Sequence, residues 1–401
     1  MARRDRSRAQ EPDSTFDGLT ASKEILVACG PGGVGKTTSA AAIAAMAACR
    51  QGGKVLVLTV DPARRLANAL GLQGIGNRER RVPAEAFDAA GMKEHGELWA
   101  AMLDTKESWD ALVRRHAPDK EASEKIIANP LYRNITARFV QSHDYIAMER
   151  LFEIHAEGSY DLIVVDTPPT RNALDFLDAP QRMADFFSSR LLRWLIIPYK
   201  SRLVNLASKP FYQIADRILG TQFLQDIAEF FVLFQTMYDG FVERARAVQR
   251  LLADRRTSFV VVSTLEAAPL REAEHFAREL AARKLHLGAL VLNKVLPAYL
   301  RDPAAAKLAN GLQERAVEIA AELRDETGGE LAEVDSNQMA RVLSEIARSY
   351  LDYRVVARRE QEQLAELASL PDVLVSVPYL ESDVFDLGGL FELGQALWGE
   401  S

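Results

Sequence analysis

The chain has 401 residues, of which 48% are hydrophobic, so it is long enough to bury a large core. Its formal net charge of −7 argues against a primary role in nucleic-acid binding, which requires a basic surface. Its two cysteines, Cys29 and Cys49, cannot build a disulfide framework or a zinc site within one chain, and they fit a reducing cytoplasm. No apolar run approaches the roughly 20 residues of a spanning helix, so we expect no stable membrane insertion.

The first segment, residues 1–22, is polar and has arginine at four of its first eight positions. This composition predicts a solvated, disordered tail. The remaining residues, 23–401, contain one phosphate-binding motif and no internal repeat. We therefore predict one nucleotide-binding domain that carries insertions.

The most informative segment follows this tail. An apolar run, Glu24–Ala28, predicts a buried strand, and an Ala-rich run further on predicts a helix. Between them lies GPGGVGKT, residues 30–37, which has the spacing of a phosphate-binding loop. Glycines let successive backbone N–H groups turn inward around the β- and γ-phosphates, and the helix adds the positive end of its dipole. Lys36 would supply a cation to the phosphates, and the Thr37 hydroxyl would ligate Mg²⁺.

This loop predicts that the protein binds a nucleoside triphosphate together with Mg²⁺. The predicted nucleotide-binding residues in and beside it are Gly30, Gly32, Gly33, Val34, Gly35, Lys36, Thr37 and Thr38.

Apolar runs rich in β-branched residues recur along the chain, and helical patterns separate them. Such alternation predicts an α/β fold with a doubly wound, mostly parallel sheet, in which ligands bind outside the carboxyl ends of the strands. The predicted strands are Glu24–Ala28, Lys54–Val60, Tyr160–Asp166, Ser258–Ser263, Gly288–Asn293 and Asp372–Val377.

Three long stretches interrupt the alternation, at about residues 83–157, 182–252 and 296–370. All three are mostly helical by pattern, and each is longer than a βαβ crossover needs. We therefore predict helical insertions that add a layer or a subdomain to the nucleotide-binding domain.

Two acidic residues follow predicted strands and are candidates for chemistry. Asp61 could hold or deprotonate the water that attacks the γ-phosphate, or it could cap a helix whose first residue is Pro62. Asp166 ends the strand Tyr160–Asp166. A carboxylate at that place beside a phosphate-binding loop usually orients Mg²⁺ through water. The predicted catalytic residues are thus Lys36, Asp61 and Asp166, and the predicted Mg²⁺ ligands are Thr37, Asp61 and Asp166.

Three motifs occur in a fixed order: GPGGVGKTT, TVDPARRLANAL and DTPPTRNALDFL. In order and spacing they resemble the ArsA-like ATPases, a family that contains the arsenite-pump ATPase and the cytosolic ATPases that target tail-anchored membrane proteins. This family belongs to the dimeric P-loop ATPases with a deviant Walker A motif. The resemblance covers most of Lys23–Leu397, through VLNKV and VPYLESDVFDLGGL, and is strongest at the nucleotide motifs.

The resemblance implies a cytoplasmic ATPase that uses ATP and Mg²⁺ and forms a homodimer or a heterodimer with a related ATPase. It places Asp61 in switch I, where it would position the hydrolytic water, and residues 166–170 in switch II. Asn293 matches the asparagine that reads adenine, although a strand-end turn residue is an equally good interpretation from the sequence. Pro378 and the loop after it would lie along the base.

The chain also departs from this family. A signature lysine normally stands at the second loop position and reaches the partner's nucleotide, but here that position is Pro31. The paired zinc-binding cysteines of the eukaryotic targeting ATPases are absent, which excludes a zinc-clamped dimer. The trio of cysteines that binds metalloid in the arsenite pump is absent too, so arsenite transport is not expected.

The insertion at 182–252 is rich in apolar residues. Residues Leu224, Ile227, Phe231, Phe234, Tyr238, Phe241, Ala245, Val248 and Leu252 step by three and four, which predicts a long amphipathic helix. In the targeting ATPases a helical subdomain at this place forms a groove for a transmembrane segment. Internal or subunit packing and binding of a hydrophobic client both account for these residues.

The leading interpretation is a dimeric ATP-driven switch that captures and releases a hydrophobic protein segment, such as that of a tail-anchored protein, or another partner. One alternative is a positioning ATPase of the partition type, although such proteins usually carry a basic surface for membranes or DNA. Another is a nucleotide-binding scaffold with little turnover, which the proline at position 31 favours.

We predict that an arginine beside a switch replaces the missing lysine, because a charge supplied to the transferred phosphoryl group can be worth on the order of 10³–10⁵ in rate. The candidates are Arg64, Arg65 and Arg171. Steady-state ATPase rates of the three single alanine variants test this prediction. A strong loss is expected for at least one of them, and three rates near that of the wild type would reject it.

Overall fold

A computed structural model describes residues 15–60, 65–72, 74–93, 95–138, 140–167, 237–327, 335–367, 373–380 and 382–400, together with residues 178–179, 181–182, 185 and 230. Its centre is an eight-stranded sheet in the order β3-β4-β2-β5-β1-β6-β7-β8. Neighbouring strands run parallel, except that β3 pairs with β4 in the antiparallel direction. The strands are β1 Ile25–Cys29, β2 Gly53–Thr59, β3 Arg80–Arg81, β4 Gly96–Met102, β5 Leu162–Asp166, β6 Thr257–Ser263, β7 Leu287–Val295 and β8 Val373–Pro378.

All six predicted strands are present, with ends that differ by a few residues, and the predicted α/β fold with a mostly parallel sheet is confirmed. The strands are apolar on both faces because helices cover both. In β1, for example, Ile25 and Val27 face one hydrophobic core, and Leu26 and Ala28 face the other. Two cores on opposite faces are the arrangement that a doubly wound sheet requires.

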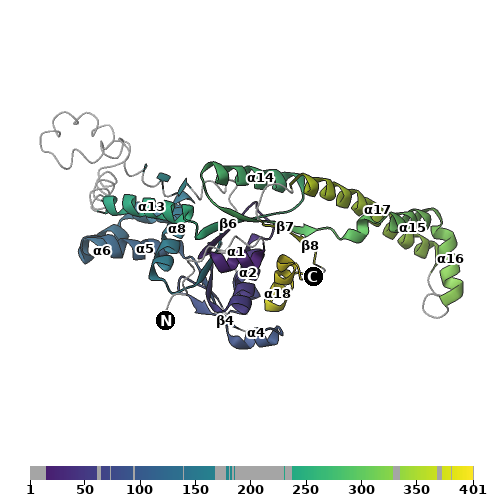
Figure 1. Cartoon of the computed structure of the whole chain (residues 1–401), viewed down its shortest axis with the longest axis horizontal. Coiled ribbons are helices and arrows are strands. Elements are labelled where there is room, and N and C mark those ends of the chain that lie inside the picture. The colour runs from purple at the N-terminus through teal and green to yellow at the C-terminus, as the bar shows by residue number, and fades with distance from the viewer. Residues whose placement is uncertain are drawn as a thin grey trace.

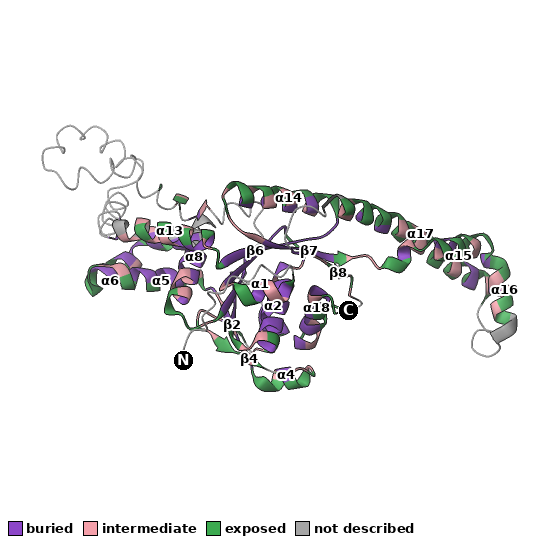
Figure 2. Ribbon diagram, viewed as in Figure 1, coloured by how far each residue is buried: buried purple, intermediate pink, exposed green. Residues whose placement is uncertain are grey.

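Two layers of helices cover the sheet (Figure 1). The helices α1 Phe16–Ser22, α2 Lys36–Gln51, α3 Arg65–Ala69, α4 Ala84–Ala89 and α18 Leu387–Trp398 supply side chains to one core. The other core receives side chains from α5 Thr105–His116, α6 Lys120–Ala128, α7 Pro130–Arg138, α8 Val140–Glu157, α13 Tyr238–Ala253 and α14 Ala267–Ala282. The purple ribbons of Figure 2 show that the buried residues concentrate in the sheet and on the helix faces turned toward it.

A helical arm, formed by residues 296–327 and 335–367, extends away from the sheet (Figure 1). It consists of η2 Ala298–Arg301, α15 Pro303–Glu314, α16 Ala316–Thr327 and α17 Ser336–Leu367. A small core of its own holds it together, made of Ala316, Ala320, Met339 and Ala340. Figure 2 shows its outer surfaces mostly exposed, and exposed apolar side chains such as Ile346 and Tyr353 lie on α17.

The structure corrects one prediction. Residues 16–22 belong to a helix, not to a disordered tail: Thr15 caps α1, and Phe16 is buried beside Trp398 of α18. The apolar residues Phe16 and Leu19 drive this docking, and the basic composition of the first eight positions concealed it. The stretch 83–157 is mostly helical, as its pattern predicts, but it also contains the strand β4, which was not predicted and which pairs with β2 over seven residues. Its run of consecutive apolar residues fits a strand buried on both faces as well as a helix.

The insertion at 182–252 lies mostly outside the described residues, as do the predicted apolar positions 224, 227, 231 and 234. Its last part is helix α13, where Ala245, Val248 and Leu252 are buried against the core shared with α8.

An ion pair between Arg244 of α13 and the buried Glu149 of α8 also links these two helices. Arg244 also lies 2.9 Å from Nδ1 of His116, and desolvation together with this cation lowers the pKa of His116 to about 4. The neutral imidazole therefore accepts a hydrogen bond from the guanidinium.

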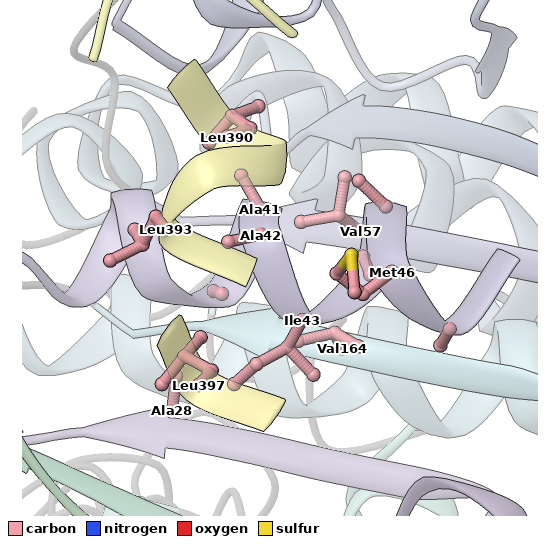
Figure 3. Close-up of a cluster of buried hydrophobic side chains, with 14 of the residues drawn as sticks. Ala28, Ala41, Ala42, Ile43, Met46, Val57, Val164, Leu390, Leu393 and Leu397 are labelled. Atoms are coloured by element: carbon pink, nitrogen blue, oxygen red, sulfur yellow. The ribbon is translucent and has the colours of Figure 1, made fainter. Parts of the chain in front are cut away.

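Helix α18 packs closely on α2, as Figure 3 shows for Leu390, Leu393 and Leu397 against Ala42 and Ile43. The close approach depends on a glycine of α18, because a Cβ atom at position 394 would overlap the side chain of Met46.

We predict that Gly394→Ala lowers the free energy of unfolding by about 1–3 kcal/mol, since the added methyl group overpacks this contact. Equilibrium urea unfolding measures the change. The matched control is Gly388→Ala in the same helix, where the new methyl group meets only Asp386 at 3.4 Å. The control should be neutral or slightly stabilising, and equal effects of the two substitutions would contradict the prediction.

Candidate functional site

The loop after β1 adopts a backbone that only glycine tolerates at its start. Gly30 has φ of 141°, and a Cβ atom there would overlap the carbonyl oxygen of Val262 at the end of the neighbouring strand β6. Any other residue would push the loop away from the sheet or force β6 aside. The glycine therefore lets the loop turn tightly against the carboxyl end of the sheet.

Lys36 begins α2, and its side chain returns over the loop. Its ammonium group is buried and donates a hydrogen bond to the carbonyl oxygen of Pro31 at 2.7 Å. The loop thus holds a cation in its own interior, at the place where the sequence predicted that phosphates bind. The acceptor is a backbone carbonyl, which any residue at position 31 would supply, but proline has no backbone N–H and so removes one donor from the loop.

The amino end of α2 has backbone groups to offer a ligand. Gly35 occupies the N-cap position with φ of 96°, and in the described structure no side chain caps this helix. The N–H groups of the first turn of a helix lack partners within the helix, and the helix dipole makes this end attractive to anions. Thr37 and Thr38 lie in the same turn and are partly exposed.

The second part of the site lies at the ends of β2 and β5. Asp166 is fully buried, and its Oδ2 accepts a hydrogen bond of 2.9 Å from the hydroxyl of Thr59, the last residue of β2. The hydroxyl of the next residue, Thr167, donates a hydrogen bond of 2.9 Å to the carbonyl oxygen of Ala28. Both contacts arise because β5 lies between β2 and β1 in the sheet. The carboxylate is therefore held beside the strand from which the loop starts.

The third part comes from β7. Asn293, 7% exposed, donates a hydrogen bond from Nδ2 to the carbonyl oxygen of Val34 at 2.8 Å. This contact reaches over the end of β6, which lies between β1 and β7. Pro378 ends β8 and pairs with Val295 of β7, so the two predicted base-contacting positions lie on neighbouring strands.

The structure thus gathers the loop residues, Asp166 and Asn293 at one edge of the sheet. Asp61 lies outside the described residues, and so do Arg64 and Arg171, whose predicted roles stay predictions. Sequence reasoning did not single out Thr59 or Thr167. In the sequence each is only a hydroxyl residue at the carboxyl end of an apolar run. Its role in the site can be recognised only once β2 and β5 are known to be neighbouring strands.

Neither cysteine offers a soft metal site. Cys29 and Cys49 are buried, and burial raises the pKa of the Cys29 thiol well above its usual range, so it stays neutral. Among the described residues, no group of three or more His, Cys, Asp or Glu side chains could hold a metal ion. Mg²⁺ bound with a nucleotide needs fewer protein ligands, because phosphates and water complete its octahedron. The Thr37 hydroxyl and the Asp166 carboxylate are the hard oxygen donors that suit it.

A family model described as anion-transporting ATPase, ArsA type, matches residues 23–326. The chain belongs to this family. It is therefore an ATPase, and the loop, Asp166 and Asn293 all lie inside the matched segment. The resemblance inferred from the nucleotide motifs is confirmed.

The chain is also similar to several curated proteins, among them two named as ATPases. An uncharacterised protein of Streptomyces coelicolor is 30% identical over 273 residues, which cover 68% of this chain and 62% of that protein. A putative arsenical pump-driving ATPase of Aquifex aeolicus is 25% identical over 68% of this chain and 80% of its own length. An ATPase ASNA1 homolog of Paramecium tetraurelia is 26% identical over 67% of this chain and 73% of its own length. None of the helices in the described part of the chain has the length and apolar character needed to cross a membrane.

We predict that Thr59→Val lowers the ATPase rate about tenfold or more, because the buried Asp166 carboxylate loses a hydrogen bond that fixes its orientation. Thr59→Ser keeps the hydroxyl group and should retain most of the rate. The measurement is steady-state turnover at saturating MgATP, with a Mg²⁺ titration for each variant. A valine variant as active as the wild type would show that this bond has no part in turnover.

Proposed function

We propose that the protein binds MgATP at the loop after β1 and hydrolyses it, with the buried Lys36 as the residue that contacts the phosphates. The single observation that carries this proposal is the ammonium group of Lys36 held within a glycine loop at the amino end of α2. On binding, the phosphate oxygens would replace the carbonyl of Pro31 as partners of this cation. The N–H groups of the first turn of α2 would add further hydrogen bonds to the anion.

Thr37 and Asp166 would hold Mg²⁺, the threonine directly and the aspartate through water. Bound Mg²⁺ would neutralise charge on the β- and γ-phosphates during transfer. Asp166 suits the role of an outer ligand because Thr59 fixes one of its carboxylate oxygens. Asp61 would orient the attacking water and accept its proton.

We further propose that the protein is a dimeric switch whose nucleotide state controls binding of a hydrophobic protein segment or partner. Two features support this proposal. The residues after Asp166 connect the nucleotide site to the apolar insertion at 182–252, and Thr167 ties the start of this connection to β1. Loss of the γ-phosphate beside switch II could therefore change how the insertion packs. In addition, relatives from Paramecium tetraurelia and Entamoeba dispar carry the name ATPase ASNA1 homolog.

A positioning ATPase and a scaffold with little turnover remain the alternative functions. A scaffold is favoured by one specific observation, the proline in place of the lysine that would reach a partner's nucleotide. The ATPase rate of the purified wild-type protein separates a scaffold from the other two.

We predict that Asp61→Asn lowers turnover by about 10²–10⁴-fold while MgATP still binds, because the amide cannot accept a proton from the attacking water. The variant should therefore accumulate in its ATP state. Affinity purification of this variant in MgATP should recover proteins with a hydrophobic terminal segment. The matched control is Asp61→Asn combined with Lys36→Met, which should bind no nucleotide and recover none of them.

Two outcomes would contradict parts of the proposal. If Asp61→Asn binds MgATP but recovers only copies of itself or a related ATPase, the protein assembles without a hydrophobic client. If calorimetry on folded wild-type protein detects no MgATP binding, the nucleotide site itself is wrong.

A further inference from the structure

The contact between Asn293 and the phosphate-binding loop constrains a peptide group of that loop. Its acceptor is the carbonyl oxygen of Val34, and the next residue is Gly35. Within one trans peptide unit the C=O and the following N–H point in opposite directions. A hydrogen bond that holds the Val34 carbonyl toward β7 therefore turns the N–H of Gly35 away from β7.

The amide of Asn293 is itself fixed in orientation. Its Oδ1 accepts a hydrogen bond of 3.0 Å from the backbone N–H of Lys294, while its Nδ2 donates to Val34. The two partners are an N–H donor and a carbonyl acceptor, so exchanging the nitrogen and oxygen of the side chain would lose both bonds. Lys294 adopts the left-handed region with φ of 61°, an uncommon conformation for a lysine. This conformation comes directly after the N–H group that donates to the Asn293 side chain.

The fit between Asn293 and the loop is close. A Cβ atom at position 35 would overlap Nδ2 of Asn293, so the glycine at the N-cap of α2 leaves the room that the side chain occupies. Val34 and Asn293 are both buried. The hydrogen bond is thus shielded from water, and a loop without it would bury an unpaired carbonyl group.

We propose that Asn293 is a positioning residue for the phosphate groups: it holds the Val34–Gly35 peptide so that the Gly35 N–H can donate to the bound phosphates. This inference rests on the proposed MgATP site and adds to it. If Asn293 only contacted the adenine, its substitution would weaken the binding of ligands that carry the base and leave the affinity for the phosphates unchanged. A residue that holds the loop affects the affinity for the phosphates even when no base is present.

A ligand without a base separates the two roles. The experiment measures binding of inorganic tripolyphosphate and of ATP, each with Mg²⁺, to the full-length protein by competition against a fluorescent ATP analogue. The variant is Asn293→Leu, which keeps a similar volume, adds no charge and cannot donate to the Val34 carbonyl. The matched control is Asn310→Leu on the exposed side of α15, where the amide bonds only within its own helix.

We expect Asn293→Leu to weaken tripolyphosphate binding about tenfold or more, the effect of leaving a buried acceptor unpaired. Asn310→Leu should bind both ligands as the wild type does. An Asn293→Leu protein that binds tripolyphosphate normally but ATP weakly would overturn the inference and leave base recognition as the role of this residue. Wild-type protein that binds neither ligand would refute the proposed nucleotide site, and the inference with it.

A second variant keeps the test decisive if Asn293→Leu is unstable. Asn293→Ala removes the donor without introducing a larger apolar group, and circular dichroism establishes that it folds. This variant should lower the affinities for tripolyphosphate and for ATP by the same factor. A loss confined to ATP would again contradict the inference.

Discussion

The nucleotide site depends on how closely the loop after β1 can approach its neighbours in the sheet. Gly30 lies against the Val262 carbonyl of β6, and Gly35 lies against the amide of Asn293 on β7. At both points a side chain on the loop would occupy space that the sheet already fills. The two glycines therefore do more than allow a turn. They let the loop rest on the ends of β6 and β7, and this support fixes the directions of its peptide groups.

The order of the strands brings the remaining groups to the loop. Because β1 lies between β5 and β6, the ends of β5 and β2 flank it on one side and those of β6 and β7 on the other. Asp166, held by Thr59, comes from the first side, and Asn293 comes from the second. The site is thus assembled from residues far apart in sequence, such as Val34 and Asn293, which are separated by 259 positions, since the parallel sheet aligns the carboxyl ends of its strands.

The helical arm starts only two residues after Lys294, and its base is tied to the same strand end. The carboxylate of Glu360 in α17 accepts a hydrogen bond of 2.9 Å from the backbone N–H of Leu296, and burial raises the pKa of this carboxyl group. The left-handed turn at Lys294 lies between this contact and Asn293. Strand β7 therefore contacts the phosphate-binding loop through Asn293 and also leads directly into the helical arm.

The sequence by itself determined the local features. Glycine spacing predicted the loop, β-branched apolar runs predicted six strands, and the motifs around residues 30, 61 and 166 indicated the family. These features are local because backbone conformation, strand propensity and loop chemistry depend on neighbouring residues. Only the tertiary structure decided which distant residues meet. It showed that β4 is a strand, because pairing with β2 rather than periodicity selects its conformation, and that Phe16 orders a helix against α18. It likewise brought Thr59 to Asp166 and Asn293 to the Val34 carbonyl, contacts set by strand order and register, which no single stretch of sequence encodes.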